Sequence, residues 1–386
     1  MRKTVLFRAP ALSLSGYGTH ARQIFRWLKD RDIDLTVDLT PWGITSWHVN
    51  PDAEGGLIGE IMKRTGNPKK TPDVTISLQL PNEWQPVSGA TNVGMSAIVE
   101  TDRCLPAWVD ACNRMDRVIV PSRFSESVLR ASGKLTVDTR VVHESFPDEI
   151  LKIDTGLELP EVKTPVNFLM VGQVTGMKPD LDRKNLFYAV KWFCEEFSGR
   201  NDVSLIIKTN LGTNSSYHRN QLNSIFGAVL KEVRKENQFP LVHLVNGEMT
   251  TQEMAQLYRS KKIKALITLT RGEGFGLPIL EAAASDLPVI CVDWSGHMDF
   301  MGLGKHISIQ HSLVEIPQER ADGSIFIKGS KWAQANEADF KKKIRKFYAS
   351  YETPRKWAID LGKTVREKFS FDAIAAQYDR ELGDLV

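Results

Sequence analysis

Residues 263–293 contain the pattern that most restricts the fold: a β-rich run, a glycine-rich turn, a short helix and a second β-rich run. The first run, KIKALITL (263–270), is rich in β-branched and leucine residues and has the length of a strand. RGEGFG follows, and Pro278 stands where a helix can begin, since proline suits a first helical position. LEAAASD predicts that helix, and LPVICVD (287–293) predicts the next strand. This order predicts a βαβ unit and therefore a parallel sheet.

Two glutamates flank the start of the predicted helix. Backbone N–H groups and the positive end of the helix dipole bind anions there, most often phosphate. Glu273 stands on the loop before the helix, and Glu281 falls about one turn into it. Two carboxylates would repel a bare phosphate but would suit a ligand with both hydroxyls and phosphate, such as a nucleotide-sugar. A structural role stays open, because glycine-rich strand–helix turns are common and acids in a first turn favour the dipole.

The same alternation of strands and helices runs along the chain in two halves, with a proline-containing stretch of little periodicity at 154–165 between them. The two halves predict an α/β protein with two parallel sheets covered by helices. The predicted strands are 4–8, 34–39, 73–78, 92–99, 117–122 and 139–146, then 166–174, 203–209, 241–247, 263–270 and 287–293. The predicted helices are 19–30 with Thr19 as cap, 122–133 with Ser122 as cap, 186–199, 220–237 and 251–262, with further helices near the C-terminus.

Composition excludes a membrane-spanning protein and favours a cytoplasmic globular one. The 386 residues are 42% hydrophobic and 25% charged, carry a net charge of +3, and include no apolar run of about 18 residues. The opening MRKTVLF is too short for the apolar core of a signal peptide, and it predicts a first strand instead. Its four cysteines, with no CxxC or zinc-ligand spacing, predict reduced structural thiols: Cys104, Cys112, Cys194 and Cys291.

Four segments together resemble the GT-B glycosyltransferases of the large retaining family often called family 4, over nearly the whole length. EGFGLPILEA matches the E-x7-E signature through Glu273 and Glu281. VGQVTGMKPDLDRKNL (171–186) matches the glycine–arginine … lysine loop. SGYGTHARQIFRWL (15–28) is similar to the N-terminal glycine loop with its helix, and FSFDAIAAQY (369–378) to the closing helical segment.

The resemblance implies a GT-B fold, with two Rossmann-like domains facing across a cleft and helices at the C-terminus. Residues 1–158 would form the acceptor-binding domain and 159–365 the nucleotide-sugar-binding domain. Residues 366–386 would form a helix that packs back on the N-terminal domain. The implied activity is transfer of a hexose or pentose from a nucleotide-sugar, with a UDP-sugar favoured, and with retention of configuration.

The resemblance also implies roles for individual residues. Glu281 would hold the ribose hydroxyls of the donor, Glu273 would contact the transferred sugar, and Lys184 would contact the diphosphate. Cations and helix N–H groups suit this work, because charge develops on the departing diphosphate. The other positions matching donor-contacting residues of the family are Gly16, Gly18, Gly172, Gln173, Gly274, Phe275, Gly276 and Leu277.

Two positions depart from the family pattern. Gln173 stands where the family usually has arginine, and Arg183 either supplies the missing charge or is a surface residue. The family histidine after the fourth strand is absent, so Glu100 or Asp102 either takes over its polar work or caps the structure. The candidate catalytic residues are therefore Glu273, Lys184, Arg183, Glu100 and Asp102. No metal ion, cofactor beyond the donor or protein nucleophile is implied, and His297 is interpreted as structural.

The acceptor is least constrained. Trp42 and Trp47 either stack on a flat ligand such as a sugar or base or provide hydrophobic cover, and KRTGNPKK (63–70) adds cations. The stretches 8–28 and 100–122 resemble phage-type members, which predicts 5-hydroxymethylcytosine in phage DNA as acceptor, in the host cytoplasm. A polysaccharide, glycan or glycolipid acceptor stays open. A non-catalytic sugar- or DNA-binding protein on this fold also stays open.

Overall fold

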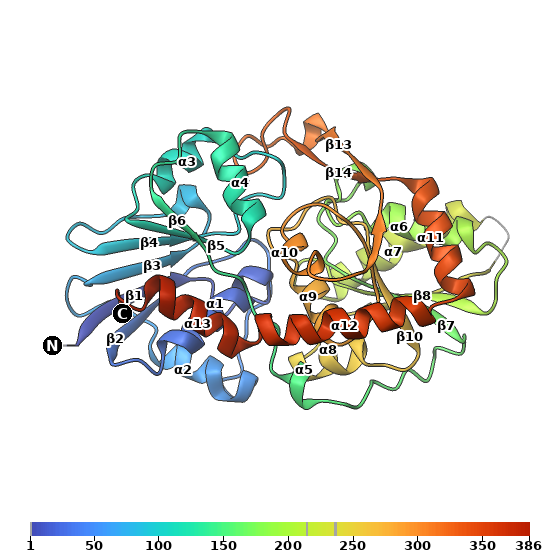
Figure 1. Ribbon diagram of the computed structural model, residues 1–386, viewed down its shortest axis with the longest axis horizontal. Coiled ribbons are helices and arrows are strands. Elements are labelled where there is room, and N and C mark those ends of the chain that lie inside the picture. The colour runs from blue at the N-terminus through green and yellow to red at the C-terminus, as the bar shows by residue number, and fades with distance from the viewer. Residues whose placement is uncertain (1, 214, 235–237) are drawn as a thin grey trace. The chain divides into compact units, whose positions relative to one another are not determined.

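The computed structural model describes residues 2–213, 215–234 and 238–386, and the chain forms two compact α/β units (Figure 1). Unit 1 runs to Ser145 and also takes in Asp322–Ser330 and Phe369–Val386. Unit 2 comprises Phe146–Ala321 and Lys331–Lys368. Each unit is therefore assembled from stretches that are far apart in the sequence.

Unit 1 is built on a six-stranded parallel sheet of order β2-β1-β3-β4-β5-β6. Val5, Phe7 and Ala9 of β1 are fully buried, and Thr4 and Leu6 of the same strand are nearly so, because both faces of a parallel sheet are covered. Its strands are β1 (Lys3–Ala9), β2 (Ile33–Leu39), β3 (Val74–Leu78), β4 (Thr91–Met95), β5 (Arg117–Val120) and β6 (Asp138–Val141). Its helices are α1 (Gly16–Leu28), η1 (Ala53–Gly56), α2 (Leu57–Lys63), η2 (Pro81–Glu83), α3 (Pro106–Cys112), α4 (Arg123–Ser132) and α13 (Phe371–Leu382).

Unit 2 has a second parallel sheet, of order β12-β11-β10-β7-β8-β9, and a hairpin of β13 and β14. The strand order reverses between β7 and β10, and ligands of such sheets bind outside the carboxyl ends of strands at this point. Its strands are β7 (Val166–Val171), β8 (Val203–Thr209), β9 (Leu241–Asn246), β10 (Ile263–Thr268), β11 (Val289–Val292), β12 (Ile307–Ile309), β13 (His311–Glu315) and β14 (Lys331–Ala335). Its helices are α5 (Glu149–Lys152), η3 (Pro179–Leu181), α6 (Leu186–Glu196), α7 (Ser216–Arg234), α8 (Thr251–Tyr258), α9 (Leu277–Ala284), α10 (Met298–Met301), η4 (Gln318–Arg320), α11 (Glu337–Ala349) and α12 (Glu352–Phe369).

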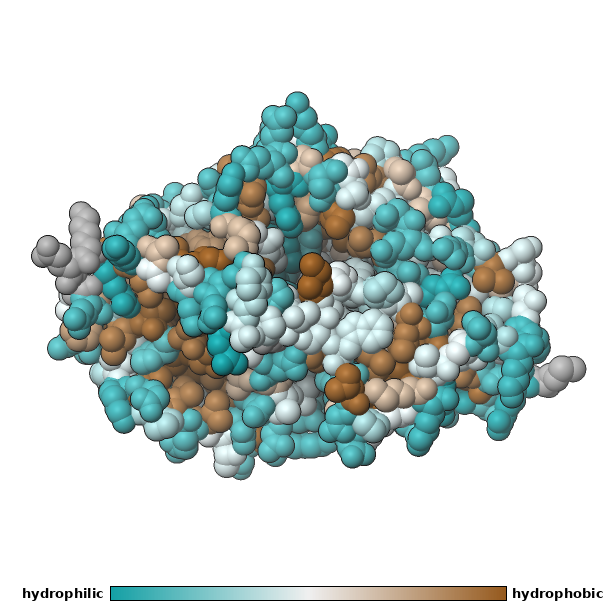
Figure 2. Space-filling view, turned by 180° about the vertical axis from the view of Figure 1, so that it is seen from behind, coloured by the Kyte–Doolittle hydropathy of each residue, from teal (hydrophilic) through white to brown (hydrophobic). Residues whose placement is uncertain are grey.

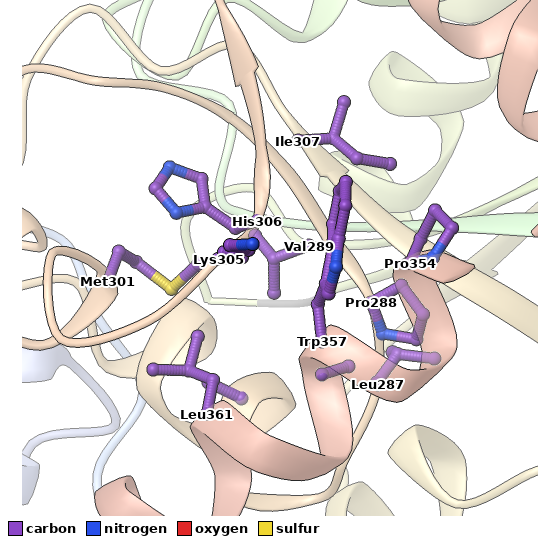
Figure 3. A pocket seen from close by; sticks show the side chains of 12 residues that line it. Leu287, Pro288, Val289, Met301, Lys305, His306, Ile307, Pro354, Trp357 and Leu361 are labelled. Carbon is purple, nitrogen blue, oxygen red and sulfur yellow. The ribbon is translucent and has the colours of Figure 1, made fainter. Parts of the chain in front are cut away.

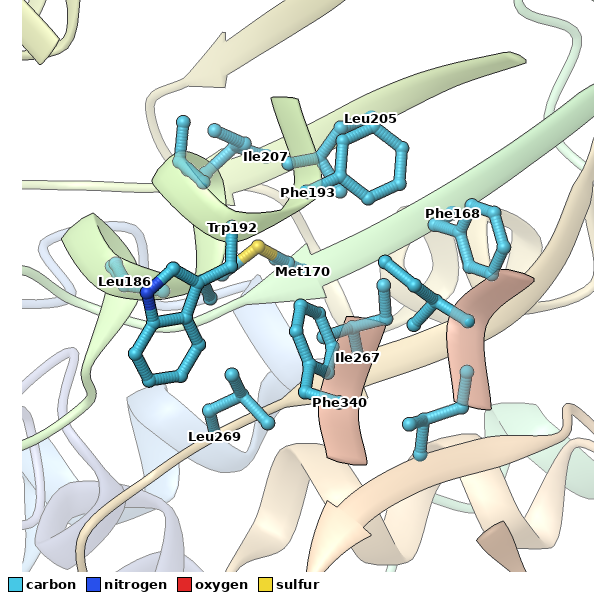
Figure 4. Close-up of a cluster of buried hydrophobic side chains, with 14 of the residues drawn as sticks. Phe168, Met170, Leu186, Trp192, Phe193, Leu205, Ile207, Ile267, Leu269 and Phe340 are labelled. Atoms are coloured by element: carbon cyan, nitrogen blue, oxygen red, sulfur yellow. The ribbon is translucent and has the colours of Figure 1, made fainter. Parts of the chain in front are cut away.

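An aromatic core holds the sheet of unit 2 against α6 and α11. Phe168 of β7 lies 5.5 Å from Phe193 of α6 and 5.4 Å from Phe347 of α11, measured between ring centroids. Figure 4 shows Phe168, Trp192, Phe193 and Phe340 gathered around aliphatic side chains of β8 and β10. Because this core is buried, the carboxyl ends of β7 and β10 rest on a rigid base.

The C-terminal helix α13 belongs to unit 1 and packs against α1 (Figure 1). His20 Nε2 and Tyr378 Oη are 2.8 Å apart, and Trp27 Nε1 donates to Asp379 Oδ1 at 2.9 Å. Burial lowers the pKa of His20 to about 3, so this histidine is neutral in the folded protein. The last residues of the chain thus complete the core formed by the first.

The α/β class with two parallel sheets is confirmed, but several predicted boundaries were wrong. The fourth strand ends at Met95 rather than residue 99, because Ile98 has a left-handed backbone (φ 61°) that no strand accommodates. Helix α1 begins at Gly16, and its cap is Ser15, whose hydroxyl accepts from Gly18 N at 3.0 Å, not Thr19. The predicted helix 220–237 is observed as α7 up to Arg234, and residues 235–237 lie outside the described residues.

The surface in Figure 2 is largely hydrophilic, with separate hydrophobic patches. Within residues 2–213, 215–234 and 238–386, every helix is too short or too polar to cross a membrane.

Candidate functional site

Apart from Gly16 and Gly18 of unit 1, the residues predicted to contact a donor lie in unit 2, where its strand order reverses. Gly172 and Gln173 follow β7, and Glu273 follows β10, the strand beside it. Gly172 N donates to Lys208 O of β8 at 3.1 Å, which holds the turn after β7 against the sheet. The two turns therefore lie at the same edge of the sheet, although about 100 residues separate them.

A compact cluster of opposite charges occupies this edge. Lys184 Nζ lies 2.6 and 2.7 Å from the two carboxylate oxygens of Glu273, and Arg183 Nη1 lies 3.6 Å from Glu273 Oε2. Glu273 is only 7% exposed. Burial by itself would raise the pKa of Glu273, but Lys184 and Arg183 outweigh burial and hold it at about 2. Glu273 is therefore ionised at neutral pH and accepts hydrogen bonds.

The loop that carries Arg183 and Lys184 is held in place by the buried carboxylate of Asp182. Asp182 is fully buried and accepts from Thr175 Oγ1 at 2.8 Å and from Leu186 N at 2.8 Å, which caps the start of α6. Arg183 Nη1 also donates to Gly272 O at 2.6 Å. These bonds point Arg183 and Lys184 toward the glycine loop, and the side chain of Arg183 is mostly buried beside Glu273.

The glycine loop 272–276 rests on the following loop, 293–297. Glu273 N donates to Ser295 Oγ at 2.9 Å, and Gly296 N donates to Glu273 O at 2.9 Å. His297 is fully buried and bonds Val292 O at 2.7 Å, and burial lowers its pKa, so the ring is neutral. The structure therefore gives His297 contacts that support the loop.

Helix α9 starts directly after this loop. Gly276 has a left-handed backbone (φ 99°), which a glycine adopts without strain, and Pro278 stands in the first turn. Phe275 turns inward and packs edge-on against Phe300 with ring centroids 5.3 Å apart. The N-terminus of α9 and the two cations thus offer positive charge beside one ionised carboxylate, a combination suited to a ligand with phosphates and hydroxyls.

Substitution of Gly296 is expected to disable this site. A Cβ atom there would lie 2.0 Å from Gly274 O and 2.8 Å from Glu273 O, so the glycine loop would have to move. A shift of about 1 Å in a catalytic group costs on the order of 100-fold in rate. Gly296→Ala is therefore expected to lower the turnover of a reaction at this site about 100-fold, measured as steady-state kcat.

Gly227→Ala is the matched control for that substitution. Gly227 lies on α7 with no atom within 4 Å of an added Cβ, so the helix should gain about 0.5–1 kcal/mol and turnover should not change. Wild-type turnover in Gly296→Ala would show that the loop tolerates displacement.

The second signature glutamate lies within α9 and has one described partner. Tyr258 Oη of α8 donates to Glu281 Oε2 at 3.0 Å. Tyr258 is 2% exposed, whereas Glu281 is partly exposed. Burial raises the pKa of Glu281 to about 7, and the bond from Tyr258 lowers it in part. The two glutamates therefore differ: Glu273 is held ionised by cations, and Glu281 titrates near neutrality.

The predicted site residues of unit 1 lie together at the start of α1. Gly16 and Gly18 are in its first turn, and Tyr17 between them places its hydroxyl 3.0 Å from Ser96 Oγ and 2.9 Å from Ala97 N. Gly18 is required by packing, since a Cβ there would lie 1.9 Å from Ser13 O. Tyr17 thus ties the glycine turn to the segment after β4.

That segment contains Glu100 and Asp102, both partly buried. The segment includes Ile98, whose left-handed backbone (φ 61°) is rare for a β-branched residue. Such strained backbone angles cluster at functional sites. Burial raises the pKa of Tyr17, and the charge of Glu100 raises it further, so the carboxylate lies within electrostatic reach of the tyrosine.

The two tryptophans of the loop after β2 differ in their surroundings. Trp42 stacks on Tyr17, with ring centroids 3.8 Å apart, so its ring provides internal cover. Trp47 is 40% exposed, and its neighbours Ile44 and Val49 are 75% and 81% exposed. Trp47 is the more exposed of the two rings.

Unit 2 also contains a cluster of metal-ligating side chains and a small cavity. Cys291, Asp293 and His306 place metal-ligating atoms within 4.8 Å of one another, but His306 Nε2 is already hydrogen-bonded to Asp293 Oδ1 at 2.7 Å. A cavity beside Trp357 and Lys305 has a volume of about 10 Å³, room for about one water molecule (Figure 3). Neither suits a nucleotide-sugar.

Sequence reasoning missed the supporting residues Tyr258, Asp182 and Ser295. Tyr258 follows the apolar pattern of α8 and shows no signal of a polar partner, and Ser295 is one serine in a loop. Asp182 lies in a D-x-D pattern that suggests a metal, whereas the structure uses it to cap α6.

Comparison with known proteins agrees with this geometry. The model of the family described as "Family 4 Glycosyltransferase in conflict systems" matches residues 133–377. No curated protein sequence matches the chain.

Solved structures share the fold over the full length. A crystal structure of a glycosyltransferase from Rickettsia africae has 15% identity and a TM-score of 0.65, covering 100% of this chain and 98% of that chain. HepE from Anabaena, crystallised with UDP and glucose, has 13% identity and a TM-score of 0.63, covering 99% and 100%. Sucrose-phosphate synthase from Thermosynechococcus elongatus has 15% identity and a TM-score of 0.62, covering 100% and 99%. These likenesses confirm the predicted GT-B fold class.

Proposed function

The chain belongs to the family 4 glycosyltransferases of conflict systems, and from that membership we propose that it transfers a sugar, with retention of configuration, from a UDP-sugar bound by unit 2. Unit 1 supplies the acceptor side, and the reaction takes place in the cytoplasm. Among proteins of this fold, HepE is crystallised with UDP-glucose, and trehalose-6-phosphate from E. coli is described as bound with UDP-2-fluoro glucose.

One observation carries the proposal: Lys184 bonds both oxygens of a buried, ionised Glu273 at the N-terminal end of α9. In the donor complex, Lys184 and Arg183 stabilise the charge that develops on the departing diphosphate, and the positive end of the α9 dipole adds to this stabilisation. Glu273 accepts hydrogen bonds from hydroxyls of the transferred sugar, and Glu281 accepts from the ribose. Gln173 carries no charge, so Arg183 provides the second cation.

Retention requires that the acceptor oxygen reach the anomeric carbon on the face that the diphosphate leaves. The anomeric carbon has oxocarbenium-like character in this transition state. A leaving phosphate oxygen takes the proton of the acceptor hydroxyl, so the step needs no protein nucleophile. Catalysis then depends on positioning the sugar and on stabilising the charge of the leaving group. Glu273 serves the first purpose, and Lys184 and Arg183 serve the second.

Release of nucleotide diphosphate without acceptor tests the donor part of the proposal. The protein would be incubated with UDP-, GDP- and ADP-sugars, and the free diphosphate measured. Slow release from a UDP-sugar, lost in Glu273→Gln, is the expected result. Tight binding without release from any donor would instead indicate a sugar-binding protein on this fold.

For the acceptor we propose 5-hydroxymethylcytosine in duplex DNA. Unit 1 has an open cavity of about 390 Å³ lined by Arg8, Asp38 and Lys70, and the basic segment 63–70 forms part of its wall. Lys69 and Lys70 are exposed, and cations in such a position bind backbone phosphates. The exposed ring of Trp47 supplies a stacking surface in the same unit.

Charge reversal at the two lysines tests that acceptor. The double substitution Lys69→Glu, Lys70→Glu is expected to weaken binding of hydroxymethylated duplex DNA at least tenfold and to flatten its salt dependence, measured by fluorescence anisotropy. The release of diphosphate from the donor should not change. Unaltered DNA affinity, or no affinity in the wild type, would exclude this surface and direct the search to glycans and glycolipids.

A further inference from the structure

Tyr258 is a buried titratable residue that the proposed reaction does not use. It lies at the end of α8 and is 2% exposed, yet its hydroxyl donates to Glu281 Oε2 of α9 at 3.0 Å. Glu281 keeps partial exposure, so its carboxylate is accessible to a ligand while one of its oxygens is bonded. The hydrogen bond therefore links Glu281, which a ligand can reach, to Tyr258, which lies in the core.

The surroundings of Glu281 contain few other charges. Helix α9 packs against α8, α10, β10 and β11. His297, at the start of α10, lies beside Gly276 and is neutral, and Arg366 of α12 bonds Ala284 O and Asp286 at the opposite end of α9. Cys291 of β11 is a buried thiol whose pKa is raised by burial. Among the described residues, burial and the Tyr258 hydroxyl are what set the charge of Glu281.

We propose that Tyr258 is a positioning residue for the nucleotide part of the donor: it fixes one oxygen of Glu281 so that the other accepts hydrogen bonds from the ribose diol. This inference rests on the proposed donor role of unit 2. A carboxylate held by one internal donor presents its remaining lone pairs in a defined direction, which lowers the conformational cost of binding a diol.

The proposal has a consequence for pH. Burial raises the pKa of Glu281 to about 7, and the Tyr258 bond works in the opposite direction by favouring the carboxylate. Below pH 7 the unliganded protein carries a protonated Glu281, and binding of a diol to the carboxylate must release that proton. Donor affinity is therefore expected to rise with pH up to about pH 7 and to level off above it.

Tyr258→Phe removes the hydroxyl and keeps the ring that fills the core. The pKa of Glu281 should rise further, so the midpoint of the affinity curve should move to higher pH. At neutral pH the affinity should fall about tenfold, as expected for a lost hydrogen bond to a charged group. The measurement is calorimetric titration with UDP-glucose from about pH 6 to about pH 9, in two buffers of different ionisation enthalpy to count the released protons. UDP-glucose is used because its diphosphate diester does not titrate in this range.

Tyr348→Phe is the matched control. The Tyr348 hydroxyl also bonds a carboxylate, that of Asp202, but at the surface of α11. This variant should keep both the affinity and the pH profile of the wild type.

The outcomes are distinguishable. Absence of UDP-glucose binding by the wild type at every pH would overturn the proposed UDP-sugar donor itself. Binding with the same pH profile in wild type and Tyr258→Phe would leave the donor intact and overturn the role of Tyr258. If Tyr258→Phe does not fold, Glu281→Gln replaces it, because an amide cannot titrate. Weak and pH-independent binding would then support the inference, and wild-type affinity with an unchanged pH profile would overturn it.

Discussion

Replacement of Lys184 by methionine is expected to lower transferase turnover about 100- to 1,000-fold, the effect of removing one preorganised group that stabilises transition-state charge. Lys184 Nζ lies 2.6 Å from Glu273 Oε1, and in the donor complex that we propose it contacts the diphosphate. KM for the donor should change less than kcat, because the charge on the leaving group grows in the transition state. Steady-state kinetics with the preferred UDP-sugar measure both quantities.

Lys191→Met is the control for this substitution. Lys191 lies on α6 and is partly exposed, and within the described part of the chain its ion pair is with Glu195, at 3.9 Å. Its loss should leave both kinetic parameters unchanged. Turnover within threefold of the wild type in a folded Lys184→Met protein would remove Lys184 from the mechanism.

The same substitution should also alter stability in acid. The pKa of Glu273 is about 2 in the folded protein, below its value of about 4.3 in an unfolded chain, so the ionised carboxylate stabilises the fold above about pH 4. In the wild type this contribution is lost as the pH falls from about 4 toward 2. Without Lys184, the pKa of Glu273 in the folded protein moves up toward its value in the unfolded chain, so the stability lost between about pH 4 and pH 2 should be smaller than in the wild type. Thermal melting across this pH range would show the difference.

The second large effect is expected at the C-terminal helix. Tyr378 is 1% exposed, its ring lies 5.2 Å from that of Trp27, and its hydroxyl bonds the buried His20. Tyr378→Ala would leave a cavity beside α1 and an unpaired imidazole, at a cost of about 3–5 kcal/mol to the free energy of unfolding of unit 1. Urea unfolding followed by tryptophan fluorescence measures that cost.

Tyr378→Phe separates the two contributions, because it removes the hydroxyl but fills the same volume. Its cost should be about 1–2 kcal/mol, that of leaving a buried polar group without its partner. A Tyr378→Ala protein as stable as the wild type would mean that the packing of α13 against α1 does not stabilise unit 1.

Strands were predicted well where burial on both faces produces a continuous apolar run, as in β3 and β8, and where apolar and polar residues alternate, as in β2. β8 was predicted at 203–209 and observed at the same residues, and β2 and β3 differ by one residue. The predicted boundaries were wrong where a single backbone angle or a helix cap determines them. Ile98 stops β4, and Ser15 starts α1 within a stretch that its glycines made look like a turn. The hairpin of β13 and β14 was not predicted. Each strand shows only a short alternation of apolar and polar residues, and a long polar loop separates the two strands.

The sequence motif predicted which residues belong to the candidate site. It did not predict their geometry or their charge states. E-x7-E spacing singled out Glu273 and Glu281. The charge of Glu273 depends on Lys184, 89 residues away in the chain, and that of Glu281 depends on burial and on the bond from Tyr258, 23 residues away. The direction of Arg183 likewise depends on Gly272 O, which only folding brings near. Long-range partners of this kind leave no local pattern in one sequence.

The most direct test of the central claim is a transfer assay read by mass spectrometry. Protein, UDP-sugars and duplex DNA with 5-hydroxymethylcytosine would be incubated, and the digested nucleosides weighed. The account predicts a hexose or pentose increment on the modified base, with release of UDP, both abolished in Glu273→Ala. A folded wild-type protein that neither releases UDP nor adds mass to this DNA or to any glycan or lipid acceptor would contradict it.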